Sequence, residues 1–169
     1  MQTYSVKDTT KMALMAAIVF LLTYTFKIPF VNGYTHLGDC AILIGVMILG
    51  RKKGALAGGV GAALSDFISG YPHWIIPTFF IKFLMATVMG LIAEKYAVKM
   101  RFHYVVGAIA GGIVQIIGYT ACKIFFYGFF QAMLMTPTLI LQTIAGVVIT
   151  VVFMTVFQKS GVLERVKAI

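Results

Sequence analysis

The chain has 169 residues, of which 60% are hydrophobic and 11% are charged, and its mean hydropathy is +0.96. These values differ from those of soluble globular domains and indicate an integral membrane protein. The net charge of +9 does not predict nucleic acid as a partner, because the basic residues lie in clusters between apolar segments instead of along one stripe.

Six apolar segments follow one another, and each is a candidate membrane span: residues 12–30, 37–50, 55–68, 74–92, 104–130 and 138–157. A helix needs about 20 residues to cross a bilayer, and the second and third segments are shorter. A re-entrant hairpin of these two would leave Arg51, Lys52 and Lys53 at membrane depth, which is costly. We therefore predict that both cross, and that the fold is all-α: one membrane domain of six transmembrane helices over residues 1–169.

The basic residues predict the orientation of this bundle. Eleven of the 14 lie at the N-terminus, after the second and fourth segments, and at the C-terminus: Lys7, Lys11, Arg51, Lys52, Lys53, Lys95, Lys99, Arg101, Lys159, Arg165 and Lys167. The predicted loops at 69–73 and 127–137 contain no Lys or Arg. Because Lys and Arg collect in cytoplasmic loops, we predict that both termini are cytoplasmic. The expected location is the cytoplasmic membrane of a prokaryote, as a multi-pass protein.

The third segment is rich in small residues and has an acidic residue near its end. Gly54, Gly58 and Ala62 recur at four-residue spacing, which predicts a flat helix face that neighbouring helices can approach closely. We expect this helix at the centre of the bundle. Asp66 follows, and an ionisable residue inside a membrane segment indicates a functional site. The alternative is that Asp66 only caps the helix or pairs locally.

Five charged residues lie within or at the edge of the predicted spans. They are the three basic residues that the predicted topology does not use, Lys27, Lys82 and Lys123, and the two acids Asp39 and Asp66. Counted along their helices at about 1.5 Å per residue, these charges and Gln142 come to similar depths in the outer half of the membrane. Such a set predicts a pocket that opens outward. Some of the charges should pair, because an unpaired charge at this depth is costly. For Lys27 and Lys123 the alternative is that they snorkel to the outer interface.

One face of the fifth segment is polar. Gln115, Tyr119 and then Cys122 or Lys123 follow at i, i+4 and i+7 or i+8, so an amide, a phenol and an ammonium group share one side of the helix. We predict that this face lines the pocket.

The predicted outer loops add polar and aromatic side chains near Asp39 and Asp66. A planar, polar heteroaromatic ligand would stack on such rings and be oriented by a few polar groups. For many of the aromatic residues the alternative is an interfacial belt in contact with membrane lipid, which needs no ligand. The predicted substrate-binding residues are Asn32, Tyr34, His36, Asp39, Asp66, Tyr71, His73, Trp74, Lys82, Gln115, Tyr119, Lys123 and Gln142.

The chain contains no convincing catalytic motif. It lacks the G-x-x-x-x-G-K-[ST] sequence of a P-loop ATPase. A rhomboid-type protease also has six spans but needs G-x-S-G within a span, whereas Ser69 and Gly70 lie at a loop edge. A pair of membrane aspartates with Gly38 before Asp39 faintly resembles aspartyl intramembrane proteases, but the motif is very short. We therefore predict a binding protein, not an enzyme, with no cofactor and no metal.

Three segments resemble a known family in their order along the chain. They are Ala13-x-x-x-Ala17, GYTHLGD at residues 33–39, and GGVGAALSDFISGYP, which ends at Pro72. With six helices in a short chain, the protein resembles the S components of energy-coupling factor (ECF) vitamin transporters over nearly its whole length. It is most similar to the branch that includes riboflavin, hydroxymethylpyrimidine and pyridoxine carriers.

This resemblance implies a mechanism and a set of partners. An S component is the high-affinity substrate-binding subunit of an ABC-type importer, and its partners are one membrane scaffold subunit and two ATPase subunits. The first loop would close the pocket, and the whole S component would topple to present substrate inside. Ala13 and Ala17 would form the docking face for the scaffold, because small residues at i and i+4 let helices approach. The alternative is that these alanines pack only within the chain.

The expected substrate is a small water-soluble vitamin or precursor, first of all pyridoxine or hydroxymethylpyrimidine. The pocket shows no surplus of cations for a multiply anionic ligand such as folate. Riboflavin or another vitamin is the alternative within the family. The alternative from another class is a stand-alone secondary transporter, coupled to protons through Asp39 or Asp66. The sequence disfavours it, because no inverted repeat of broken helices is evident.

Overall fold

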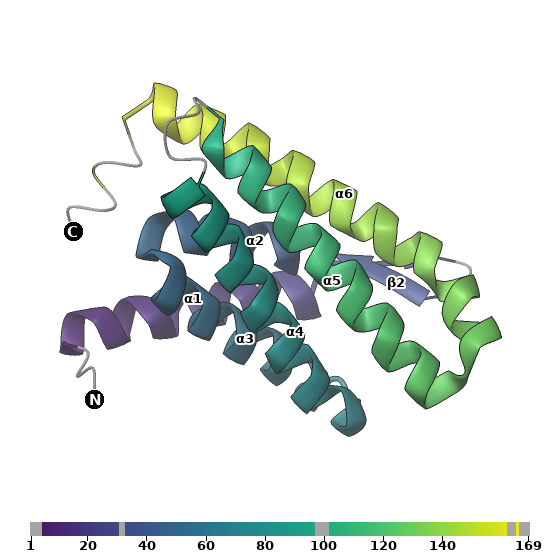
Figure 1. Ribbon diagram of the computed structural model, residues 1–169. Helices are drawn as coiled ribbons and strands as arrows, with labels where there is room; N and C mark the ends of the chain where they lie inside the picture. The colour runs from purple at the N-terminus through teal and green to yellow at the C-terminus, as the bar shows by residue number, and fades with distance from the viewer. Residues whose placement is uncertain (1–4, 31–32, 97–101, 162–164, 166–169) are drawn as a thin grey trace.

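The computed structural model describes residues 5–30, 33–96, 102–161 and 165. This part of the chain folds into six α-helices and one short β-hairpin (Figure 1). The helices are α1 (Val6–Tyr24), α2 (Gly38–Leu49), α3 (Arg51–Ile68), α4 (Pro72–Leu91), α5 (His103–Tyr127) and α6 (Phe129–Lys159). The hairpin strands are β1 (Lys27–Phe30) and β2 (Gly33–His36), and a π-helical turn, η1 (Ile92–Tyr96), continues α4. The prediction of an all-α fold with six helices is confirmed.

Helix α3 packs closely against neighbouring helices, as its small residues predict. It packs against α1, α2 and α4. A Cβ atom at Gly54 would lie 2.6 Å from the Cα of Val46, and one at Gly58 would lie 2.7 Å from the side chain of Ile42. Both contacts are with α2, so the glycines let two helices approach more closely than larger side chains would allow. Ile42 and Val46 belong to the main hydrophobic core, together with Met85 of α4.

Three helical stretches in the described part of the chain are long and apolar enough to cross a membrane: Pro72–Tyr96, His103–Tyr127 and Phe129–Lys159. Helix α2 is apolar but shorter, with 12 residues. On α5, Ile113, Ile117 and Ile124 are exposed, which is typical of a surface that faces lipid. The crossing of the membrane by all six helices, and the cytoplasmic position of both termini, stay predictions.

The first predicted segment is wrong at its end. The prediction extends this helix to Phe30, whereas α1 ends at Tyr24 and residues 27–30 form strand β1, which pairs antiparallel with β2. The physical reason is Pro29, which cannot donate a helical hydrogen bond and disfavours helical geometry at the residue before it. The apolar run therefore continues past the helix, and hydropathy alone does not mark the boundary.

The predicted loop at 127–137 is also wrong, because Gly128 alone joins α5 to α6. Gly128 has a φ of +83°, which glycine adopts without strain, and its N–H donates to the carbonyl oxygen of Ile124 at 3.0 Å. Helix α6 begins at Phe129 and contains Pro137. Proline has no N–H to donate to the carbonyl oxygen four residues earlier in the helix. A membrane helix tolerates this loss, because neighbouring groups can donate to that oxygen instead.

The basic cluster at 51–53, predicted to be a loop, forms the first turn of α3 instead. The N–H of Arg51 donates to Glu94 Oε1 at 2.9 Å, so a carboxylate lies at the positive end of the helix. Lys53 donates to Asp8 at 2.5 Å, and this hydrogen bond lowers the pKa of the Asp8 carboxyl. These contacts tie α1, α3 and η1 together at one end of the bundle.

Candidate functional site

A cavity of about 320 Å³ lies between the α3–α4 connection and helices α4, α5 and α6, with the end of β2 beside it. Small-molecule sites have volumes of about 300–1,000 Å³, so this cavity is at the small end of the range. Its lining residues are His36 of β2, Asp66 of α3, Tyr71 of the connection, Trp74 and Thr78 of α4, Tyr119, Lys123 and Tyr127 of α5, and Met135, Thr138, Leu139 and Gln142 of α6.

One part of the lining is an aromatic wall formed by Trp74, Tyr119 and Tyr127. The ring centroid of Trp74 lies 5.6 Å from that of Tyr119 and 6.2 Å from that of Tyr127. Trp74 Nε1 donates to the hydroxyl of Tyr127 at 2.9 Å, and the same hydroxyl lies 3.0 Å from His73 Nε2. These hydrogen bonds join the start of α4 to the end of α5. The wall therefore offers fixed rings on which a planar ligand can stack.

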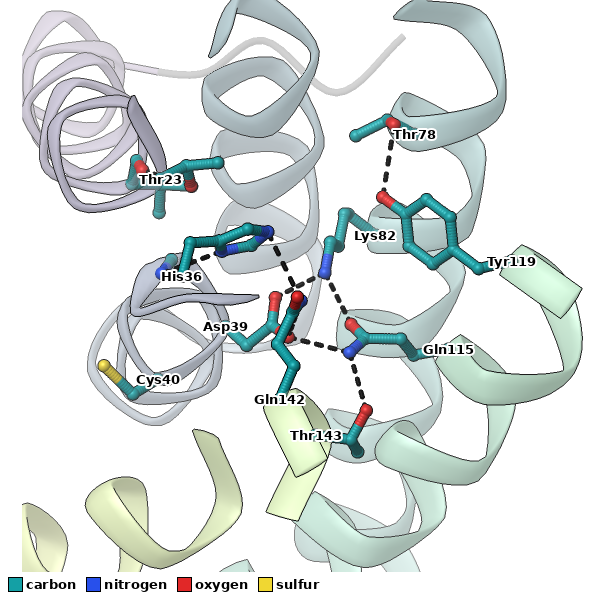
Figure 2. Close-up of polar contacts among 12 residues, drawn as sticks. Thr23, His36, Asp39, Cys40, Thr78, Lys82, Gln115, Tyr119, Gln142 and Thr143 are labelled. Atoms are coloured by element: carbon teal, nitrogen blue, oxygen red, sulfur yellow. Dashed lines mark hydrogen bonds and ion pairs between the residues drawn. The ribbon is translucent and has the colours of Figure 1, made fainter. Parts of the chain in front are cut away.

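A buried network of polar side chains lies next to the cavity and joins α2, α4, α5 and α6 (Figure 2). Asp39 at the start of α2 and Lys82 of α4 form an ion pair. Gln115 of α5 accepts from Lys82 at 2.5 Å and donates to Asp39 at 2.7 Å. Gln142 of α6 donates to Asp39 at 2.9 Å. We call these four residues the buried network; Thr143 extends it by accepting from Gln115 at 2.8 Å.

Burial explains why these groups bind one another. Asp39 and Lys82 are 2% and 1% exposed, and a charge out of contact with water is costly unless it is paired and hydrogen-bonded. Both carboxylate oxygens of Asp39 accept hydrogen bonds, and the Lys82 ammonium donates to two partners. The expectation that charges at this depth pair is confirmed for these two residues.

Gln142 and Tyr119 connect the buried network to the cavity. Gln142 is a member of the network and also lines the cavity. Tyr119 lies with its ring centroid 5.2 Å from Lys82 Nζ, and its hydroxyl donates to Thr78 at 3.1 Å (Figure 2). A change in the network is therefore expected to reach the groups that line the cavity.

His36, the last residue of β2, contacts α2 and α6. Its Nδ1 lies 3.2 Å from the backbone nitrogen of Gly38, and its Nε2 lies 3.3 Å from Nε2 of Gln142 (Figure 2). Both neighbours are N–H donors, and a neutral imidazole accepts at only one of its nitrogens. At most one of these two contacts is a hydrogen bond at a given moment.

The structure distributes the predicted binding residues over the cavity and its surroundings. Those that line the cavity are His36, Asp66, Tyr71, Trp74, Tyr119, Lys123 and Gln142. The others described with their side chains are Asp39, Lys82 and Gln115 in the buried network and His73 beside the aromatic wall. Tyr34 lies in β2, and Asn32 lies outside the described residues.

The predicted polar face of α5 reaches the cavity at Tyr119 and Lys123 only. Gln115, one turn earlier, is 0% exposed, because its amide is held between Asp39 and Lys82. The sequence pattern places Gln115 on the correct side of the helix but does not reveal that other side chains cover it.

Several lining residues were not predicted: Thr78, Tyr127, Met135, Thr138 and Leu139. Thr78 lies four residues from both Trp74 and Lys82, so helical spacing could have identified it. Met135 was missed because the prediction begins the sixth helix at residue 138, whereas α6 begins at Phe129. Leu139 is apolar, and nothing in the sequence distinguishes it from a residue that faces lipid.

The chemistry of the lining suits binding and orientation of a planar polar molecule. It combines rings with hydroxyl groups, one amide, one carboxylate and one ammonium group. Among the residues that the structure describes, no group of three His, Cys, Asp or Glu side chains could hold a metal ion.

Comparison with known proteins identifies relatives over most of the chain. Residues 3–159 match the family described as ECF-type riboflavin transporter, S component. A protein of Pyrococcus woesei, described as an uncharacterized protein in gap 3'region, is 32% identical over 134 residues, which cover 79% of this chain and 88% of that protein. The thiamine precursor transporter HmpT of Lactococcus lactis subsp. cremoris (strain MG1363) is 26% identical over 167 residues, which cover 97% of this chain and 95% of that protein.

The family match covers nearly the whole chain, and it confirms the resemblance that the GYTHLGD segment and its neighbours indicate. This family consists of transporter components and is not a family of enzymes. The chain therefore belongs to the family of ECF-type riboflavin transporter S components.

Proposed function

We propose that this chain is the substrate-binding subunit of an ECF-type importer, and that its cavity binds a vitamin or vitamin precursor with one heteroaromatic ring. Hydroxymethylpyrimidine is the first candidate and pyridoxine is the second. The observation that carries the proposal is the cavity of about 320 Å³ with its aromatic wall, in a chain of this family.

Size favours a single ring over riboflavin. Riboflavin has three fused rings and a sugar-alcohol chain, whereas the cavity is at the small end of the range for ligand sites. A relative that aligns with 97% of the chain is described as a thiamine precursor transporter, which supports the same choice.

In the proposed complex the ligand ring stacks on the aromatic wall. The polar substituents of the ligand are bound by other lining residues, namely His36, Asp66, Tyr71, Lys123 and Gln142. His73 supports the wall, and the buried network holds Gln142 in place. Asn32 and Tyr34 stay predicted contacts from the first loop, which would close over the ligand.

The position of the cavity supports an outward-facing site. Helix α3 begins with the basic cluster at 51–53 and carries Asp66 in its last turn. At about 1.5 Å per residue, these positions are about 20 Å apart. If the basic cluster is cytoplasmic and all six helices cross the membrane, as we propose, the cavity opens to the outside.

We also propose that α1 docks on a membrane scaffold subunit that carries two ATPase subunits. Ala13 and Ala17 are both exposed and lie four residues apart. The other side of α1 packs on α3, where a Cβ atom at Gly61 would lie 2.9 Å from Val19. Exposed small side chains leave a flat surface that another helix can approach, so this exposure supports docking more than packing within the chain.

Identification of the bound molecule tests the proposed substrate. The full chain is purified, the small molecules that it retains are extracted and identified by mass spectrometry, and affinities are then measured by calorimetry with hydroxymethylpyrimidine, pyridoxine and riboflavin. Stoichiometric binding of hydroxymethylpyrimidine or pyridoxine would support the proposal. Retention of a lipid or peptide would contradict it, and so would binding of riboflavin alone.

We propose ATP-driven import rather than proton coupling. Asp39, one of the two acids considered as a proton carrier, is bound by Lys82, Gln115 and Gln142. Vesicles that contain this chain alone should not accumulate hydroxymethylpyrimidine when a pH gradient is applied. Vesicles that also contain the scaffold and ATPase subunits should do so when ATP is supplied. Gradient-driven uptake by the chain alone would overturn this part of the proposal.

A further inference from the structure

Two polar donors of the aromatic wall already have partners within the protein. The N–H of Trp74 donates to Tyr127, and the hydroxyl of Tyr119 donates to Thr78. These donors would have to leave their partners before they could bind a ligand, and a buried polar group that loses its partner is costly. The wall therefore contributes mainly ring surface, and the polarity of the site depends on other side chains.

Gln142 is one of those side chains, and the buried network determines the orientation of its amide. Its nitrogen donates to Oδ2 of Asp39 at 2.9 Å. Asp39 is paired with Lys82, and an ionised carboxylate only accepts hydrogen bonds. If the Gln142 amide were reversed, two oxygens would face each other in a buried site. The ion pair thus specifies that the nitrogen of Gln142 points to Asp39.

The carbonyl oxygen of Gln142 is then the end of the amide that remains for a ligand. Gln142 lines the cavity, and this oxygen accepts no hydrogen bond from any residue that the structure describes. We infer that Asp39 and Lys82 are positioning residues that present the Gln142 oxygen as an acceptor, so that the site selects a ligand with an N–H or O–H donor at this point. This inference rests on the proposed function and adds to it the type of group that the substrate must carry.

The test compares hydroxymethylpyrimidine with two analogues of nearly the same shape. In one analogue a methyl group replaces the amino group, and in the other an ethyl group replaces the hydroxymethyl group. One of these two groups, the amino or the hydroxyl group, is the donor that Gln142 recognises. Calorimetry of the purified full chain should show that hydroxymethylpyrimidine binds about two- to tenfold more tightly than the analogue that lacks this recognised donor. In Gln142→Met this preference should disappear, because methionine has nearly the same volume but no carbonyl oxygen.

The double variant Asp39→Asn with Lys82→Met tests the positioning role. An asparagine side chain can donate to the Gln142 oxygen as well as accept from its nitrogen, so the amide is no longer held in one orientation. The preference for the donor-bearing ligand should fall, while the affinity for the analogue that lacks the recognised donor should change much less. Thr150→Val is the matched control, because Thr150 lies on the same helix, is 0% exposed and donates only to the carbonyl oxygen of Gly146.

The outcomes separate this inference from the proposed function. If folded, monodisperse wild-type protein binds none of the three pyrimidines and no pyridoxine, both are overturned. If all three pyrimidines bind and Gln142→Met lowers the affinity for each of them by the same factor, only the inference is overturned. An unchanged ligand preference in the folded double variant overturns the positioning role of Asp39 and Lys82. Gln142→Met tests the acceptor independently, because unequal losses among the three ligands require an acceptor at Gln142.

Discussion

Asp39 at the start of α2 and Lys82 of α4 bind each other almost completely out of contact with solvent, with side chains that are 3% and 1% exposed. The pair also holds Gln115 and, through Asp39, Gln142. It is therefore both a contact between helices and a support for the cavity.

Loss of one partner from this pair should destabilise the fold strongly. Lys82→Met leaves the Asp39 carboxylate buried without its counter-charge, which costs about 3–5 kcal/mol. The double variant Asp39→Asn with Lys82→Met should be markedly more stable than Lys82→Met alone, because both charges are removed together. Chemical unfolding in detergent micelles measures both effects. Equal losses in the two variants would show that the charges do not stabilise each other.

Fluorescence of Trp74 should report ligand binding directly, because it is the single tryptophan in the chain and it lines the cavity. Saturating hydroxymethylpyrimidine should change the emission, since a stacked ring excludes water from the indole. A calorimetric binding signal with no change in emission would place the ligand elsewhere.

Tyr127→Phe should weaken ligand binding about two- to tenfold, or 0.5–1.5 kcal/mol, because it removes the hydroxyl that accepts from Trp74 and contacts His73. Calorimetry measures this change. Tyr96→Phe is the control, because Tyr96 is exposed on η1. If both variants bind as the wild type does, the hydroxyl of Tyr127 does not hold the wall in its binding geometry.

Lys123→Met should weaken binding of a ligand that presents an acceptor or an anionic group. Lys123 lines the cavity, and its ammonium makes no ion pair with any residue in the described part of the chain. A hydrogen bond to a charged group contributes about 1.5–3 kcal/mol, or roughly ten- to a hundredfold in Kd. Lys95→Met, on the exposed side of η1, serves as the control. An unchanged Kd for Lys123→Met would mean that this side chain snorkels to the interface instead.

Ala13→Trp or Ala17→Trp should prevent recovery of this chain with the scaffold subunit and leave ligand affinity unchanged. A bulky side chain on the exposed face of α1 keeps a neighbouring helix at a distance. Co-purification from cells that express all subunits measures the effect. Ile117→Trp is the control, since Ile117 is 64% exposed on a different helix. Normal recovery of the complex with both α1 variants would refute docking through this face.

Gly54→Ala should destabilise the bundle by about 1–3 kcal/mol, because the added methyl group would lie 2.6 Å from the backbone of Val46, which cannot move aside as a side chain can. Val60→Ala on the same helix should change stability by less than about 0.5 kcal/mol, because Val60 is 45% exposed. Thermal unfolding in micelles compares the two variants. A neutral Gly54→Ala would mean that α2 and α3 separate at little cost.

The amino-acid sequence was enough to predict the membrane class, the family, the six helices and the close packing of α3 against its neighbours. These features depend on hydropathy, on small residues at four-residue spacing and on motif order, all of which are local along the chain. Local signals also identified lining residues: Trp74 follows the predicted loop beside Asp66, and Tyr119 lies on the polar face of the fifth segment.

Helix boundaries required the tertiary structure. The apolar run of the first segment continues to Phe30, although α1 ends at Tyr24. Pro137 suggests a helix boundary, although α6 continues through it. Pro29 accounts for the first boundary, but Pro137 has no such effect, so a proline in an apolar segment does not by itself show whether the helix ends there.

Which charges pair, and which face the cavity, depends on contacts between helices that are far apart in the sequence. Asp39 binds Lys82, which is 43 residues away, and Gln142, which is 103 residues away. Pattern and spacing show the side of a helix on which a residue lies, but not which other helix covers that side. For this reason the sequence placed Gln115 among the residues of the pocket, whereas the fold places it in the buried network, where Asp39 and Lys82 bind both ends of its amide.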